Sequence, residues 1–291
     1  MRLDLFLSQK TRLSRHQTQK MIQNGAVKVA GLVILKPAFK IRGDEKIEYE
    51  IPKFFTESAL LPEAIPLDIL YEDEHIIVVN KPAHLVIHPA PGHPSGTLVN
   101  ALLHRYGSLP LGNEELKPGI VHRLDKGTSG VMVVARTPEA MAELQRQFKS
   151  REVEKFYLGL VVGQPLMEGT IDKPLGRHMK DRQKMSSRTK KGREAKTEWK
   201  ILKTFEEEVS WLEIQIHTGR THQIRVHFSE AGFPLVGDPT YGKGNKKWKA
   251  LINRPALHAW RLSFTHPATG EEMQFTAPIP KDLETLLAAL T

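Results

Sequence analysis

Short runs of apolar residues, each of a length suited to one strand, recur from residue 67 to the carboxyl end of the chain. Ile76–Val79 and Val131–Ala135 are continuous runs, which is typical of strands buried on both faces. Further strands are expected at residues 156–162, 198–205, 211–217, 257–264 and 272–275, and helices at residues 138–148, 221–231 and 282–290. Because strands and helices do not alternate regularly, the pattern predicts an α+β fold rather than repeated βαβ units.

The composition excludes several classes of protein. No apolar run approaches the ~18 residues that cross a membrane, and the first residues lack the apolar core of a signal peptide. The chain has no cysteine, which excludes disulfides, cysteine nucleophiles, iron–sulfur clusters and zinc sites built on thiolates. We therefore expect a cytoplasmic protein that does not bind a membrane.

The chain of 291 residues is long enough for two domains. Residues 1–52 have the pattern of a small module, with two short helices, a helix end at Gly25 and a hairpin turn at Ala30-Gly31. Residues 53–66 contain prolines and little periodicity, as expected of a linker. The second domain is expected to span residues 67–291.

Two segments carry most of the positive charge. The net charge is +9, with 42 Lys and Arg against 33 Asp and Glu. Residues 1–43 have an excess of eight positive charges and residues 173–203 an excess of nine, so the rest of the chain is net acidic. Two separate basic segments on an otherwise acidic protein indicate a nucleic-acid partner. The alternative is two solvated faces, or a disordered basic loop at residues 177–193.

Motifs for other chemistries are missing. The sequence has no phosphate-binding GxxxxGK[ST] loop, no GxGxxG after a strand and no GxSxG elbow. His217, His222 and His227 recur every five residues, a spacing that does not place side chains on one face of a helix. We therefore expect no bound nucleotide, dinucleotide or metal ion.

One segment is dense in residues that can do chemistry. In HRLDKGTSG, residues 122–130, Asp125 lies between two cations, Arg123 and Lys126, and before a glycine-rich turn. A carboxylate beside fixed cations stays ionised and can act as a nucleophile or a base. On chemistry alone, Asp125 could equally be a salt-bridged turn residue.

The same segment resembles the central motif of RNA pseudouridine synthases of the RluA/RluD type. Other stretches in the same order also resemble this family: KPAHLVIHPAPGHPSGTLVNAL at 81–102, KFY at 155–157, TGRTHQIRVH at 218–227 and GDPTYG at 237–242. The basic segments at 176–185 and 190–197 look like the family's RNA-facing loop. Residues 1–52, with RLDLFL at 2–7, resemble the small αL-type RNA-binding module named after a ribosomal protein, the S-four type. The resemblance implies a mixed, mainly antiparallel sheet flanked by helices and loops.

The resemblance also assigns roles to residues. It implies that Asp125 is the essential aspartate, that Tyr157 stacks on the target base, that Arg225 pairs with the aspartate and that Arg123 holds the RNA open. Without it, Tyr157 would be a core tyrosine and Arg225 a solvated helix arginine. The basic segments and motifs give further candidate RNA-binding residues: Arg12, Arg15, Lys20, Arg177, Lys184, Lys190, Lys191, Arg193, Arg220 and His222.

The implied reaction turns uridine into pseudouridine, which exchanges no electrons and therefore needs no redox cofactor or metal. The implied partner is RNA, with large-subunit ribosomal RNA as the leading expectation, bound by a monomer. Two alternatives stay open: the same chemistry on tRNA, and a non-catalytic RNA-binding factor in ribosome assembly. Many family members have Gly where this chain has His84 and Pro where it has Met179, and His84 would strain a turn that needs a positive φ.

Overall fold

The computed structural model divides the chain into two compact units, residues 1–61 and 62–291. It describes residues 1–11, 13, 15–42, 45–51, 60–90, 92–111, 117–181, 184–189, 191–206, 209–242 and 247–290. The first half of the expected linker, residues 53–59, lies outside these ranges. The end of that linker belongs to the second unit, since the backbone N–H of Glu63 donates to the carbonyl of Asn100.

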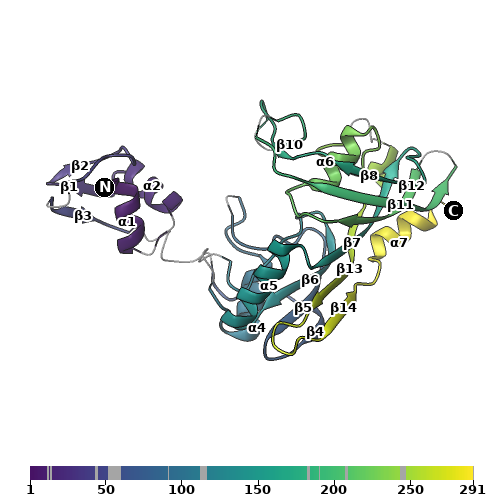
Figure 1. Ribbon diagram of the computed structural model, residues 1–291, viewed down its shortest axis with the longest axis horizontal. Helices are drawn as coiled ribbons and strands as arrows, with labels where there is room; N and C mark the ends of the chain where they lie inside the picture. The colour runs from purple at the N-terminus through teal and green to yellow at the C-terminus, as the bar shows by residue number, and fades with distance from the viewer. Residues whose placement is uncertain are drawn as a thin grey trace. The chain divides into compact units, whose positions relative to one another are not determined.

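The first unit packs two helices against a three-stranded sheet (Figure 1). The helices α1 (Leu3–Thr11) and α2 (Arg15–Gln23) precede the strands β1 (Val27–Val29), β2 (Leu32–Val33) and β3 (Ile47–Tyr49). Fully buried side chains form its core: Leu3, Leu7, Met21, Ile22 and Val27. Gly25, after α2, has a φ of 77°, and Ala30 and Gly31 form the turn between β1 and β2 with φ of 50° and 78°. The predicted helix end and hairpin turn are therefore confirmed.

The second unit is built on one large sheet. Its strand order is β4-β5-β6-β13-β7-β12-β11-β8, and β14 also pairs with β13. Neighbouring strands are antiparallel except β6 and β13, which are parallel, so the α+β fold with a mixed, mainly antiparallel sheet is confirmed. The strands are β4 (Asp68–Glu72), β5 (Ile76–Lys81), β6 (Ser129–Ala135), β7 (Glu154–Val162), β8 (Glu168–Asp172), β11 (Lys196–Phe205), β12 (Val209–Ile216), β13 (Leu257–Thr265) and β14 (Glu272–Thr276). A separate hairpin joins β9 (Gly176–Arg177) to β10 (Met185–Ser186).

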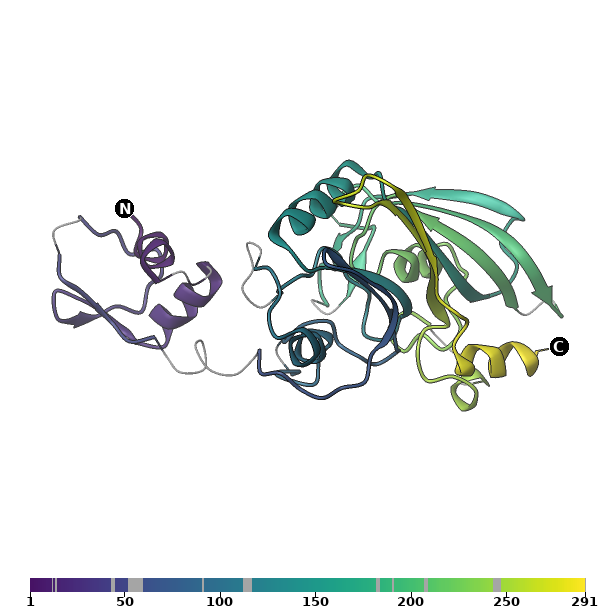
Figure 2. The same ribbon diagram turned by 90° about the horizontal axis from the view of Figure 1, so that it is seen from below.

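Helices pack around this sheet (Figures 1 and 2). They are α4 (Leu98–Tyr106), α5 (Pro138–Ser150), α6 (Gln223–Glu230) and α7 (Lys281–Ala288), with a short 3₁₀ turn η1 (Lys247–Ala250). The Thr137 side chain caps α5 by accepting from the N–H of Ala140, as its position before Pro138 predicts. No described helix is long and apolar enough to span a membrane.

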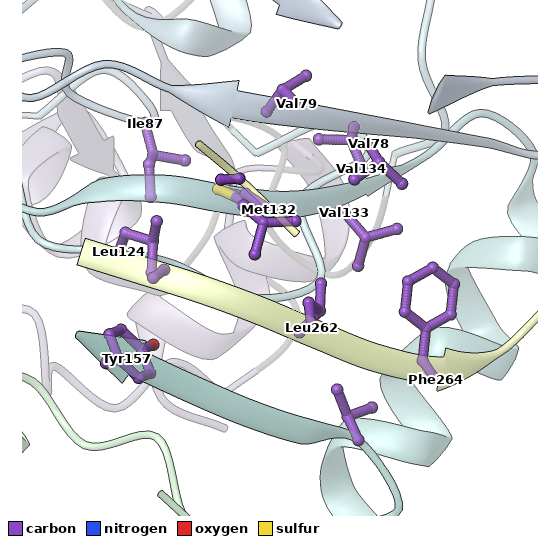
Figure 3. Packing of buried hydrophobic residues seen from close by; sticks show 14 of the residues in the cluster. Val78, Val79, Ile87, Leu124, Met132, Val133, Val134, Tyr157, Leu262 and Phe264 are labelled. Carbon is purple, nitrogen blue, oxygen red and sulfur yellow. The ribbon is translucent and has the colours of Figure 1, made fainter. Parts of the chain in front are cut away.

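Strand β7 separates two hydrophobic cores. Tyr157 and Val161 face the larger core, while Leu158 and Leu160 face a smaller one, in keeping with the alternation of side chains along a strand. Figure 3 shows Tyr157 in the larger core, in which Leu124 and Leu262 are also buried. The aromatic ring of Tyr157 is thus fixed on the fold by its packing.

The parallel pairing of β6 with β13 depends on a glycine. Gly130 has a φ of 119°, and a Cβ atom at this position would lie 2.1 Å from the carbonyl oxygen of Ala259. No other residue type allows the two backbones to approach so closely. Because Gly130 follows Asp125 by only five residues, this contact also fixes where the segment of Asp125 leaves the sheet.

Candidate active site

A cavity of about 340 Å³ opens where four parts of the second unit meet. Its walls come from residues 121–128, from the end of α5, from β7 and from the segment that joins β12 to α6. Seven of the described lining residues are Lys or Arg, and Asp125 is the single acid among them. The cavity therefore attracts an anionic ligand, and one carboxylate lies in its wall.

Asp125 and Arg225 meet in this cavity. Nη1 of Arg225 donates to Oδ2 of Asp125 at 3.2 Å, although the two residues are 100 positions apart in the chain. The side chain of Asp125 is 17% exposed and that of Arg225 is 8% exposed. Among the described residues, no hydrogen-bond donor reaches Oδ1 of Asp125. One oxygen of the carboxylate is thus held by a guanidinium while the other stays available to a ligand.

A second carboxylate holds the same arginine. Asp238 accepts from Nε of Arg225 at 2.7 Å and from Nη2 at 3.0 Å, and its side chain is fully buried. Its Oδ1 also accepts from the backbone N–H groups of Thr240 and Tyr241, at 2.8 and 3.0 Å. The ring of Tyr241 lies 5.1 Å from the guanidinium. Asp238 therefore fixes the plane of the guanidinium through two of its nitrogens, and the third nitrogen, Nη1, donates to Asp125.

The charge of Arg225 survives its burial because of these partners. Burial works against the guanidinium charge, but the hydrogen bonds and charge of Asp238, and then those of Asp125, outweigh it and raise the pKa of Arg225. Arg225 is therefore not the solvated helix arginine of the alternative interpretation. The motif GDPTYG, residues 237–242, is visible in the sequence, but the role of Asp238 is not. Its ion pair with Arg225 joins residues 13 positions apart, and no local pattern predicts it.

Backbone hydrogen bonds hold the segment that carries Asp125, at the aspartate and at the three residues after it. The N–H of Thr128 donates to the carbonyl of Asp125 at 3.0 Å, and the N–H of His84 donates to the carbonyl of Lys126 at 2.7 Å. Nη1 of the buried Arg254 donates to the carbonyl of Gly127 at 3.2 Å. His84 has a φ of 69°, so a non-glycine residue does occupy a left-handed position there, as the sequence comparison anticipated. These bonds fix the position of the Asp125 backbone, and none of them occupies an oxygen of its carboxylate.

Tyr157 faces the cavity from β7, and its residue is 8% exposed. Burial, and then the charge of Asp125, raise the pKa of its phenol, so the ring stays neutral. Lys155, two residues earlier, lines the same cavity, whereas Phe156 lines a shallow hollow elsewhere on the surface and Leu158 faces the smaller core. Tyr157 and Lys155 therefore share one face of β7, and Tyr157 belongs to the larger core as well as to the cavity.

His222 is a further neighbour of the carboxylate. Its Nε2 lies 4.0 Å from Oδ2 of Asp125, and its Nδ1 lies 2.8 Å from the hydroxyl of Tyr241. Burial lowers the pKa of His222 although the charge of Asp125 opposes this. The imidazole is therefore mainly neutral at pH 7.

The other predicted RNA-binding residues fall into four groups. Arg123, Arg193 and Arg220 line the cavity with His222. Arg177, Lys184 and Lys191 lie outside its lining, around the hairpin of β9 and β10, and Arg15 and Lys20 are exposed on α2 of the first unit. Arg12 and Lys190 lie outside the described residues. Within the described part of the chain, no group of three or more His, Asp or Glu side chains is arranged to hold a metal ion.

Comparison with known proteins gives the same assignment from two directions. The family model described as RNA pseudouridylate synthase matches residues 75–230, and the S4 domain model matches residues 1–47. An uncharacterized RNA pseudouridine synthase of Synechocystis is 45% identical over 99% of this chain and 89% of its own length. A protein of Xanthomonas campestris named ribosomal large subunit pseudouridine synthase D is 42% identical over 95% of this chain and 85% of its own length.

A solved structure also shares the fold over most of this chain. Human RNA pseudouridylate synthase domain containing 1 aligns with a TM-score of 0.61 and 28% identity, over 78% of this chain and 96% of that one. The family model covers more than half of the chain, and relatives more than 40% identical cover nearly all of it. With its basic cavity around a single held carboxylate and an S4 domain in front, the chain belongs to the RNA pseudouridine synthase family.

Proposed function

We propose that this enzyme isomerises uridine to pseudouridine in large-subunit ribosomal RNA and that Asp125 is the residue on which the reaction depends. The observation that carries the proposal is the geometry of Asp125, with one oxygen bound to Arg225 at 3.2 Å and the other open to a basic cavity. Two relatives support the ribosomal target. One is from Xanthomonas campestris and one from Zymomonas mobilis, and both proteins are named ribosomal large subunit pseudouridine synthase D.

The reaction breaks one bond to the ribose and makes another. The bond between N1 and C1′ breaks, the uracil turns, and a bond forms between C5 and C1′. The proton on C5 passes to solvent and N1 takes up a proton, so no electrons are exchanged and no group is lost. The carboxylate of Asp125 acts beside C1′, C2′ and C6, where the bonds change.

The base must leave its stack before Asp125 can reach it. In this proposal Tyr157 stacks on the free uracil, because its ring is fixed by the core and faces the cavity. Arg123 is exposed at the cavity wall, where it can hold the RNA in its opened form. The cationic residues around the cavity and on α2 bind the backbone and offset the cost of extruding the base.

The substrate and setting follow from the ribosomal target. The enzyme would work in the cytoplasm as a monomer, on ribosomal RNA or a precursor particle. The same chemistry on tRNA is the competing proposal, and a non-catalytic assembly factor is the third. The oxygen of Asp125 that accepts no hydrogen bond from the described residues favours an enzyme over a factor that only binds RNA. Binding RNA needs no carboxylate in a cavity lined by Lys and Arg.

Mapping pseudouridines in RNA from a deletion strain tests the target. We expect one or more pseudouridines to be missing from large-subunit ribosomal RNA and to return with the wild-type gene but not with Asp125→Asn. Pseudouridines missing from tRNA alone would favour the tRNA alternative. Full modification of both RNAs in the deletion strain would contradict the proposed function.

A further inference from the structure

Lys155 is a buried cation without a counterion. It lies on β7, lines the cavity beside Tyr157 and is 8% exposed. Among the residues that the structure describes, no carboxylate or other hydrogen-bond acceptor reaches its Nζ atom. The nearest defined partner is the ring of Phe148, whose centroid lies 5.8 Å from Nζ. Within the described part of the chain, no negative charge therefore balances this ammonium group.

Such a group is costly to keep. Burial, and then the nearby charge of Arg151, lower the pKa of Lys155 to about 8. Buried charges in proteins are normally paired or hydrogen-bonded, and an apolar side chain of similar length would pack beside Phe148 without this penalty. The ammonium is thus poorly explained by the stability of the fold and well explained by a ligand that supplies the missing negative charge.

The surroundings of Lys155 indicate which part of the RNA that ligand is. Lys149, Arg151, Arg193 and Arg220 line the same cavity. Arg151 forms an ion pair with Glu194, at 2.6 Å, and Nε of Arg220 donates to the carbonyl of the same glutamate. A uracil carbonyl needs one neutral donor, whereas a backbone phosphate is bound by a group of cations. The excess of positive charge favours a phosphate.

We propose that Lys155 binds an RNA phosphate next to the extruded nucleotide, so that β7 holds one nucleotide at two points. Lys155 and Tyr157 are two residues apart on one face of the strand, which separates them by roughly 7 Å along it. A base stacked on Tyr157 and a phosphate bound by Lys155 can therefore belong to the same nucleotide. This assignment rests on the proposed function, and it adds an anion subsite to the pocket around Asp125.

The test combines a change in the protein with a change in the RNA. RNA affinity is measured for wild type and Lys155→Met, with a hairpin that contains the mapped target uridine. The same hairpin is also made with a single neutral methylphosphonate linkage, placed in turn on the 5′ or the 3′ side of that uridine. Lys281→Met is the matched control, because it removes one exposed positive charge from α7, outside the cavity lining.

We expect Lys155→Met to weaken binding of the normal hairpin by about tenfold or more, the usual effect of one hydrogen bond to a charged group. One of the two neutral linkages should weaken binding to wild type by a similar factor and binding to Lys155→Met by less than about twofold. Lys281→Met should bind within about twofold of wild type. The melting temperature of Lys155→Met should equal or exceed that of wild type, because the variant buries no unpaired charge.

Three results would overturn the subsite. One is equal RNA affinity of Lys155→Met and wild type, including the case in which only kcat falls. The second is that both neutral linkages weaken both proteins by the same factor. The third is a lower melting temperature of Lys155→Met with no coupling to either linkage, which would make Lys155 a structural residue.

The proposed function is tested separately, by the mapping of pseudouridines in RNA from the deletion strain. If the target uridine lies in tRNA, the ribosomal proposal fails and the same measurements are made on the tRNA hairpin. If no target is found, hexauridylate and its methylphosphonate analogue replace the hairpins in the binding assay, with the same expected and contrary results.

Discussion

Two loops of the second unit hold the same guanidinium in different ways. In the loop of residues 237–242, Asp238 is fully buried and both of its oxygens accept hydrogen bonds, from Arg225 and from two backbone N–H groups. In the loop of residues 123–128, Asp125 is partly exposed and receives one donor from Arg225. The carboxylate with every oxygen occupied orients the arginine, and the carboxylate with an oxygen to spare faces the substrate. The difference in hydrogen bonding separates a positioning acid from a reacting one.

Replacing each aspartate by asparagine should show this difference in the free energy of unfolding. Asp238→Asn removes the buried partner of Arg225, and breaking such a pair costs about 3–5 kcal/mol of the free energy of unfolding. Asp125→Asn removes a single, partly exposed contact, and we expect a cost below about 1 kcal/mol. Urea denaturation of both variants gives the comparison. Equal losses would show that the two carboxylates do not differ in the way their hydrogen bonds suggest.

The stability of the fold should decrease at acidic pH because of His258, which lies next to the loop of Asp125. Ser129, at the start of β6, is hydrogen-bonded to Nδ1 of His258 at 2.9 Å, and burial lowers the pKa of His258 to about 4. Below pH 6.5 the unfolded chain takes up a proton at this histidine, whereas the folded protein does not until about pH 4. Stability should therefore fall as the pH drops through this window, by about 2–3 kcal/mol from this group.

The contribution of His258 is measured by comparison with His258→Gln, which does not titrate. Urea denaturation at pH 7.5 and pH 4.5 should show a smaller loss of stability for the variant than for wild type, while all other titrating groups are shared. A variant that loses as much stability as wild type would rule out His258 as the origin of the acid sensitivity.

The local elements of the fold were predictable, whereas the contacts between distant segments were not. The cap of Thr137 on α5 and the turn at Ala30-Gly31 depend on neighbouring residues, and both were expected from the sequence. Helix α4 was missed, because its first five residues are all buried and show no helical periodicity. The parallel pairing of β6 with β13 joins residues about 130 positions apart, and no local pattern encodes such a pairing.

The site was predictable only in part for the same reason. The resemblance of HRLDKGTSG and its companion motifs named Asp125, Tyr157 and Arg225, and the fold brings all three to one cavity. The second partner of the guanidinium, Asp238, and the unpaired state of Lys155 are properties of three-dimensional packing. A sequence motif shows that such residues are present, and the structure shows which atoms are occupied.

A smaller effect sharpens the description of the Asp125 loop. His84 bonds this loop while it holds a left-handed φ of 69°, a conformation that costs a non-glycine residue about 1–2 kcal/mol. His84→Gly removes that strain but adds backbone freedom in the unfolded chain, so we expect a net gain of about 0.5–1 kcal/mol. Thermal denaturation checks this, with His104→Gly, at an exposed position of α4, as a control that should lose stability.

The smallest expected effect concerns the basic segment that holds Lys191 and Arg193. Lys191 and Arg193 are exposed, and Arg193 also lines the cavity. If both contact RNA phosphates, replacing them by Met should reduce the slope of log affinity against log salt by about 0.7 for each lost contact on single-stranded RNA. Binding titrations at several salt concentrations give the slope. An unchanged slope would place this segment outside the interface.

Release of tritium from RNA labelled at C5 of uridine tests the central claim most directly, because the C5 proton leaves only when the new bond to the ribose forms. Wild type should release tritium from the target RNA. Asp125→Asn should release it at least about 100-fold more slowly while it folds normally and binds the RNA within a few-fold of wild type. Tritium release by Asp125→Asn at the rate of wild type would contradict the assignment of Asp125 as the reacting group.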